Sequence, residues 1–246
     1  MRYHFERLKI PPADTVFEYY LNIEEMKFMP WNVTEFNYEP KMPYFSILVP
    51  TVDTLRYSTM LDILIKIKKQ VFFTGETGVG KSVIIQKYIS SNQEKNQLMP
   101  IFLNFSAQTD SFSTQQTIES KLEKKKGKVL LGAKGNNTLV LFIDDVNMPS
   151  VEKYGAQPPI ELLRQLLTDK GFYDRPNFYQ KKIENFCCIC AAAPPSGGRA
   201  PLTPRFIRHF HMFCLPQPSD DTMITIFEGI VLEFLKAYNF VESVKK

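Results

Sequence analysis

The 246-residue sequence has few cysteines, no long apolar run and little net charge. Its four cysteines are too few for the disulfide framework of a small secreted domain. No segment reaches the roughly 18 apolar residues of a membrane span, and the N-terminal MRYHFERLKIPP lacks the apolar core and cleavage site of a secretory signal. The net charge of +4 is too small to indicate a nucleic-acid surface. We therefore expect neither a membrane nor a nucleic acid as partner.

The remaining composition, 44% hydrophobic and 23% charged residues, is typical of a globular domain and excludes disorder of the whole chain. Short apolar segments rich in β-formers predict five strands, at 71–74, 101–105, 139–145, 185–193 and 209–215. Helical patterns lie before, between and after them, at 51–70, 81–92, 114–126, 158–171 and 219–238. Strands that are apolar along their whole length must be buried on both faces, which favours an α/β fold with a mainly parallel sheet between helices.

Several local signals refine these boundaries. Thr51 or Asp53 is expected to cap the first helix, and Ser113 with Gln116 has capping-box spacing. Gly171 is expected just after the end of the helix at 158–171. The stretches 126–137 and 172–182 predict hairpins or surface loops, and the charge run 121–128 predicts a solvated helix end.

The aromatic and proline-rich residues 1–45 show no clear period. We interpret them as an extended connector whose aromatic side chains pack on the main domain or on a neighbour. An ordinary loop with one short helix near 14–21 is an equal alternative. Cys187, Cys188 and Cys190 lie in an apolar strand without metal-ligand spacing, so they are expected in the core of a reduced protein.

Residues 75–82 read GETGVGKS and match the phosphate-binding pattern G-x-x-x-x-G-K-[ST]. An expected strand precedes this loop and an expected helix follows it. Such a loop wraps a polyphosphate with backbone N–H groups, and the helix N-terminus attracts negative charge. We therefore expect ATP or ADP with Mg²⁺ to bind here, with Lys81 on the β- and γ-phosphates and Ser82 on the metal. The predicted binding residues are Gly75, Glu76, Thr77, Gly78, Val79, Gly80, Lys81 and Ser82.

The segment LVLFIDD (139–145) supplies a second, acidic half of such a site. Asp144 is expected to hold Mg²⁺ together with Ser82. Asp145 stands where a general base would orient the attacking water, although it could instead only cap or orient neighbouring groups. Many hydrolases of this kind have Glu there, and Asp is one methylene shorter. Since reactive geometry is sensitive at about the 1 Å scale, hydrolysis by Lys81, Asp144 and Asp145 could be slow or absent.

Beyond the loop, long stretches carry a family resemblance. The segments FIDDVNMP (142–149), KYGAQPPIELLRQLL (153–167), AAAPPSGGR (191–199) and LTPRFIRHF (202–210), with ILVPTVDTLRY (47–57), together resemble the third AAA+ module of axonemal dynein heavy chains. The resemblance runs from about residue 30 to the C-terminus. It implies an AAA+ large subdomain at 46–217, a connector at 1–45 and only the start of a helical lid subdomain at 218–246.

The resemblance also implies roles for residues outside the loop. Val49, Pro50 and Thr51 would border the adenine. The fourth strand should end in a polar sensor residue, but this position falls at about Ala193, which has no polar side chain group. Arg205, or as a second choice Arg208, would be an arginine finger that acts in trans on the nucleotide of the neighbouring module. The stretches 127–137 and 170–182 would be hairpin inserts that face other ring elements.

The implied partners are the other AAA+ modules and the linker of a six-module motor ring, with dynein intermediate and light chains and microtubules only indirectly. The implied location is the cytoplasm, the cytoskeleton and the ciliary axoneme. Two further hypotheses remain: a module that holds nucleotide permanently without turnover, and a free-standing P-loop NTPase or small-molecule kinase. Kinases of that sort normally carry an arginine-rich lid, and arginines are sparse here. The mild charge disfavours a nucleic-acid-remodelling ATPase.

Overall fold

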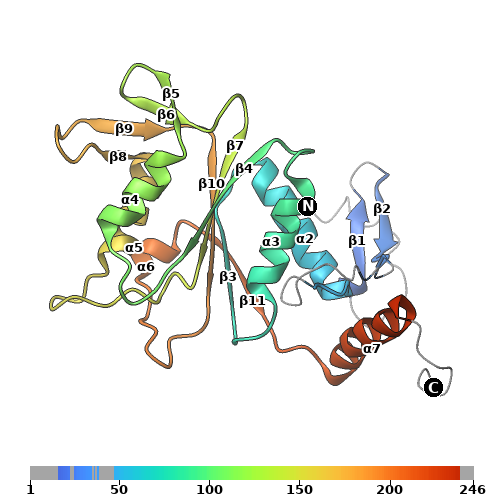
Figure 1. Cartoon of the computed structure of the whole chain (residues 1–246). Helices are drawn as coiled ribbons and strands as arrows, with labels where there is room; N and C mark the ends of the chain where they lie inside the picture. The colour runs from blue at the N-terminus through green and yellow to red at the C-terminus, as the bar shows by residue number, and fades with distance from the viewer. Residues whose placement is uncertain (1–15, 23–24, 35, 37, 39–46, 239–246) are drawn as a thin grey trace, which may run out of the picture. The chain divides into compact units, whose positions relative to one another are not determined.

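The computed structural model describes residues 16–22, 25–34, 36, 38 and 47–238 (Figure 1). The chain divides into two compact units. The larger unit is Met60–Pro218, and the smaller one joins the residues up to Thr59 with those from Ser219 onward. Within the described residues, none of the helices has both the length and the apolar character that crossing a membrane requires.

A five-stranded parallel sheet forms the centre of the larger unit, in the order β11-β3-β10-β7-β4. All five strands were expected from the sequence, and their bounds agree with it to within three residues. This sheet confirms the predicted α/β fold class. The strands are β3 (Val71–Gly75), β4 (Leu98–Asn104), β7 (Thr138–Asp144), β10 (Phe186–Ala192) and β11 (His211–Leu215).

The two most buried strands are β7 and β10. Every residue of β10 is buried, and so are the five residues Leu139–Ile143 of β7. The three cysteines of β10 are therefore core residues, as expected. Burial raises the pKa of the Cys187 and Cys190 thiols, because the charged thiolate is disfavoured away from water.

Helices cover both faces of the sheet (Figure 1). Helix α3 (Lys81–Asn92) lies on one face, while α4 (Ser111–Ser120), α5 (Pro158–Asp169) and α6 (Pro204–Ile207) lie on the other. The Tyr88 hydroxyl of α3 donates a hydrogen bond of 2.9 Å to Asp62, in the part of α2 (Val52–Lys66) that belongs to the larger unit. Helix α2 ends at Lys66, four residues before the predicted end, and Lys68 then turns the chain with a positive φ of 55°.

The predicted helix at 114–126 is wrong at both ends. Asp110, not Ser113, caps α4, because its carboxylate accepts hydrogen bonds from the backbone N–H groups of Phe112 and Ser113. The helix stops at Ser120, and the charge run that follows forms strand β5 (Glu123–Lys126) instead of a helix end.

Strand β5 belongs to a second, four-stranded sheet in the order β5-β6-β9-β8. Its other strands are β6 (Leu130–Gly132), β8 (Gly171–Tyr173) and β9 (Gln180–Ile183). The antiparallel pair β8–β9 confirms the hairpin expected at 172–182. The antiparallel pair β5–β6 forms a hairpin too, but its first strand lies before the expected stretch 126–137, in residues predicted as helix. The Lys181 ammonium joins this sheet to α4, because it pairs with Asp174 at 2.6 Å and with Glu119 at 2.7 Å.

The turn between α5 and β8 differs from the expected one. Lys170, with a φ of 53°, is the left-handed residue after the helix, and Gly171 already begins β8. Gly171 is needed for another reason: a Cβ at this position would lie 2.0 Å from the backbone carbonyl oxygen of Lys181. The close approach of β9 therefore excludes any side chain at residue 171.

The smaller unit contains the antiparallel hairpin β1 (Tyr19–Asn22) and β2 (Lys27–Pro30), the 3-10 helix η1 (Val16–Glu18), the start of α2, and α7 (Asp220–Ala237). The 3-10 helix η1 lies within the stretch 14–21 where one interpretation expected a short helix, whereas neither interpretation predicted the strand at 19–22. Residues 14, 15 and 39–46 lie outside the described part. Within this unit, the Tyr38 ring packs edge-on against Phe234 of α7, with centroids 6.2 Å apart.

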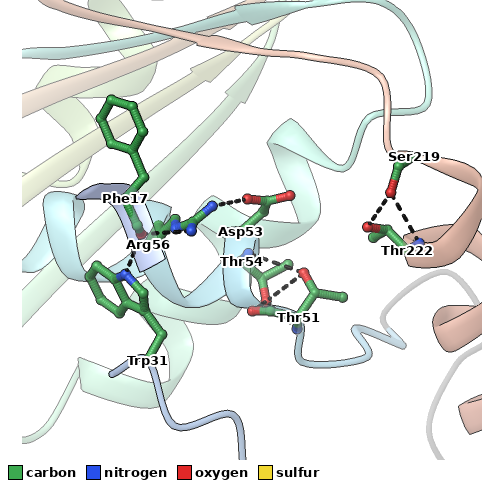
Figure 2. Close-up of polar contacts among 8 residues, drawn as sticks. All are labelled: Phe17, Trp31, Thr51, Asp53, Thr54, Arg56, Ser219 and Thr222. Atoms are coloured by element: carbon green, nitrogen blue, oxygen red, sulfur yellow. Dashed lines mark hydrogen bonds and ion pairs between the residues drawn. The ribbon is translucent and has the colours of Figure 1, made fainter. Parts of the chain in front are cut away.

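Polar contacts fix the ends of this unit's helices (Figure 2). Thr51, one of the two expected caps, accepts a hydrogen bond from the Thr54 N–H and donates its own N–H to Thr54 Oγ1. Asp53, the other candidate, pairs instead with Arg56 at 2.9 Å. Arg56 also donates to the Phe17 carbonyl, which Trp31 Nε1 reaches too. Ser219 caps α7 through the Thr222 N–H.

We expect Gly171→Ala to lower the free energy of unfolding by about 1–3 kcal/mol, because the added methyl group would overlap backbone atoms of β9 that cannot move aside. Gly132→Ala in the same sheet is the matched control. There the new Cβ meets only the flexible side chains of Lys125 and Glu184, at 3.0 Å or more. Urea unfolding of both variants measures the difference, and equal losses would contradict the contact.

Candidate functional site

A cavity of about 260 Å³ opens at the carboxyl ends of the central strands. The connection that leaves β3 leads to β4 at one edge of the sheet, whereas the one that leaves β10 passes β3 to β11 at the other edge. Neighbouring strands whose connections depart in opposite directions leave a crevice where ligands bind in open α/β sheets. The cavity is lined by Thr77, Gly78, Gly80, Lys81, Ser82, Val83, Asp144, Asp145, Ala193 and Arg199.

The phosphate-loop sequence surrounds the N-terminus of α3, which begins at Lys81. Gly80 precedes it in the left-handed conformation with a φ of 86°, which favours glycine, and no side chain caps the helix. The first N–H groups of an α-helix have no partner within the helix. They are thus free to bind an anion at the end where the helix dipole is positive.

Lys81 lies folded over the loop and is only 9% exposed. Its ammonium donates to the carbonyl oxygens of Gly75 at 2.9 Å and Glu76 at 2.7 Å. An ammonium has three protons, so one remains for a ligand in the cavity. Burial lowers the pKa of Lys81, and the negative charges of Asp144 and Asp145 oppose this shift.

The two carboxylates at the end of β7 differ in their surroundings. Asp144 is the last residue of the strand, and its Oδ1 accepts a hydrogen bond of 3.0 Å from the Asp145 N–H. Asp145 has a positive φ of 49°, and its carboxylate lies 3.8 Å from Arg199 Nε. Asp145 therefore lies beside a positive charge.

The Ser82 hydroxyl and the Asp144 carboxylate line the same cavity. Both are oxygen donors of the kind that Mg²⁺ prefers, and Mg²⁺ is commonly held by one or two such groups together with phosphates. The residues present therefore fit the expected metal ion.

Two residues of the site were not singled out in the sequence. Asn147 is buried, and its Nδ2 donates a hydrogen bond of 2.9 Å to the Ala193 carbonyl, so it joins the loops that follow β7 and β10. Arg199 lines the cavity. The sequence signal for both was weak: a polar residue just after the acidic pair, and the arginine of the GGR segment.

Other predicted residues lie elsewhere. Arg205 and Arg208, at the short helix α6, are exposed and do not line the cavity. Val49, Pro50 and Thr51 belong to the smaller unit, where Thr51 caps α2. Their role toward an adenine, like the trans role of the arginines, stays a prediction.

The fold and the loop define a P-loop α/β domain, and comparisons with known proteins narrow this class. The family model described as the P-loop containing dynein motor region matches residues 36–218. Dynein axonemal heavy chain 6 of Homo sapiens is 46% identical over 240 residues, which is 97% of this chain and 6% of that protein. Dynein axonemal heavy chain 12 of Rattus norvegicus is 42% identical over 194 residues, 79% of this chain and 6% of that protein.

A third relative, dynein axonemal heavy chain 9 of Homo sapiens, is 35% identical over 244 residues, 98% of this chain and 5% of that protein. This chain belongs to the family of P-loop dynein motor regions, and its sheet and loop are those expected of an AAA+ domain. It spans only about one-twentieth of the length of these relatives.

We expect Asn147→Asp to destabilise the chain by about 3–5 kcal/mol, because it places a buried carboxylate against the Ala193 carbonyl oxygen. Asn147→Ala removes the hydrogen bond without adding a charge and should cost about 1–2 kcal/mol. Urea unfolding monitored by circular dichroism compares the two. If Asp is tolerated as well as Ala, the amide does not donate to that carbonyl.

Proposed function

We propose that this chain is a nucleotide-binding AAA+ module of an axonemal dynein heavy chain, the third in its ring. In this proposal Mg²⁺-bound ATP or ADP occupies the cavity beside the phosphate loop, and its identity changes the arrangement of neighbouring ring elements, which regulates microtubule-based motor activity. The observation that supports it most is the convergence of Lys81, Ser82 and Asp144 on one cavity at the end of a parallel sheet.

The residues divide the work of binding among them. The N-terminus of α3 and the loop amides hold the phosphates, and the Lys81 ammonium neutralises charge at the β- and γ-positions. Ser82 and Asp144 would hold Mg²⁺, which when bound neutralises charge on the phosphates. Val49, Pro50 and Thr51 would border the adenine, and Arg205 would act in trans on the nucleotide of the next module.

Several features support slow turnover at this site. Asp145 is one methylene shorter than the glutamate that many hydrolases of this kind have at this position. The end of β10 offers Ala193, whose side chain cannot hold a water molecule. A module that binds nucleotide and releases it slowly, as a regulator or as permanent structural support, therefore fits better than a fast ATPase.

The proposed partners follow from the family. They are the neighbouring AAA+ modules and the linker of the same heavy chain, with intermediate chains, light chains and microtubules reached only indirectly. The relatives are named as axonemal dynein heavy chains, so the proposed location is the cytoskeleton of the ciliary axoneme within the cytoplasm.

We expect Lys81→Ala to weaken the binding of Mg²⁺-bound ADP by about 10- to 100-fold, because a charged hydrogen-bond donor to the phosphates is lost. Isothermal titration calorimetry measures the dissociation constant. Lys87→Ala is the control, because Lys87 also lies on α3 but is exposed and does not line the cavity. Unchanged affinity in Lys81→Ala would refute the assignment of the site.

We expect the 246-residue chain by itself to bind ATP weakly and to hydrolyse it slowly. The proposed ring neighbours are not included with it, so they cannot contribute to binding or to catalysis. Single-turnover hydrolysis with excess protein gives the rate of the chemical step, and Lys81→Ala supplies the background. Tight binding together with fast steady-state turnover would contradict the proposal of a regulatory site.

A further inference from the structure

Arg199 has a buried donor that nothing in the described structure satisfies. Its Nε is inaccessible to water and has no hydrogen-bond partner among the described residues. The side chain as a whole is 22% exposed and lines the cavity beside the phosphate loop. Buried polar groups in folded proteins are almost always hydrogen-bonded, so an orphaned donor at a cavity wall indicates a missing acceptor.

The ion-pair partner of Arg199 Nε does not provide that acceptor. The Asp145 carboxylate is 3.8 Å away, whereas charge-assisted N–H···O bonds measure about 2.7–2.9 Å. The two groups attract each other without forming a hydrogen bond. Asp145 is therefore a weak ion-pair partner of Arg199, and an acceptor that forms a true hydrogen bond would replace it.

The backbone holds Arg199 at the cavity wall from both sides. A turn closes through the hydrogen bond from the Arg199 N–H to the Ser196 carbonyl, over Gly197 and Gly198 with φ values of 58° and 87°. The next N–H, that of Ala200, donates to the Asn147 carbonyl at 3.1 Å. The arginine is thereby tied to the loop that follows the two aspartates.

One part of the cavity wall is apolar except for Arg199. Outside the phosphate loop and the two aspartates, its lining residues are Val83, Ala193 and Arg199, and of these only Arg199 is polar. The Arg199 charge is also close enough to lower the pKa of Lys81. Two cationic side chains thus face the space where phosphates are expected.

We propose that Arg199 binds the terminal phosphate of a nucleoside triphosphate in this module, in place of the polar side chain that Ala193 lacks, and that Asp145 holds Arg199 when this phosphate is absent. The inference rests on the proposed nucleotide site. A guanidinium is always charged and presents paired donors that match phosphate oxygens, so it distinguishes a triphosphate from a diphosphate at this position.

When Arg199 exchanges Asp145 for the terminal phosphate, binding of this phosphate is coupled to the loops that follow β7 and β10. When Arg199 turns to the phosphate, Asp145 loses its positive neighbour. Because Ala200 and Ala193 are both bonded to Asn147, the change falls on the two loops that follow β7 and β10. Binding of the terminal phosphate would thus change the loops at the carboxyl ends of the two central strands.

The test compares two ligands on the 246-residue chain by calorimetry: Mg²⁺-bound ADP and the nonhydrolysable triphosphate analogue AMP-PNP. We expect Arg199→Ala to weaken AMP-PNP about 10- to 100-fold and ADP by less than about threefold. Arg199→Lys keeps the charge but not the paired donors, so it should show a smaller loss that is still selective for AMP-PNP. Thermal melting checks that each variant is folded.

Arg164→Ala is the matched control, since Arg164 pairs with Glu161 on α5 and does not line the cavity. It should change neither affinity. Equal losses of both ligands in the Arg199 variants, or no loss of either, would overturn the role of Arg199 while leaving the site in place. If the wild-type chain bound neither ligand, the proposed function would fail, and this inference with it.

Discussion

Burial of β7 and β10 on both faces is the constraint on which the remaining structure depends. Apolar side chains on both sides of a strand leave no solvent face, so helices must cover the sheet from each side, and crossover connections make the strands parallel. Parallel strands in register bring Gly75, Asp144 and Ala192 to one edge of the sheet. The cavity exists because three core strands end together.

This dependence explains how much of the molecule could be predicted from its sequence. The five strands and the phosphate loop were predicted because their signals are local: continuous apolar runs, and glycines followed by Lys81. The end of α4 was missed because the charged residues of β5 resemble a helix end, and only their pairing with β6 makes them a strand. Asp110 was missed because Ser113 offered a capping pattern of equal local quality.

The candidate site likewise contains residues that local sequence signals predict and residues that they do not. The residues of the loop and the acidic pair could be named beforehand, since their chemistry is carried by residue type and spacing. Arg199 and Asn147 act through contacts that span more than 40 residues of sequence, and no local pattern separates them from surface residues. The roles of Val49, Pro50, Thr51 and Arg205 depend on elements of other units or modules, so they stay predictions.

The cysteines of β10 allow the exposure of this central strand to be measured by chemical modification. Thiolate is the reactive form, and burial keeps the thiols of Cys187 and Cys190 protonated, while Cys214 on β11 is exposed. An alkylating reagent should therefore modify Cys214 at once, and the thiols of β10 only when the sheet opens. The rate of this slow labelling reports on opening of the strand that supports the proposed nucleotide site.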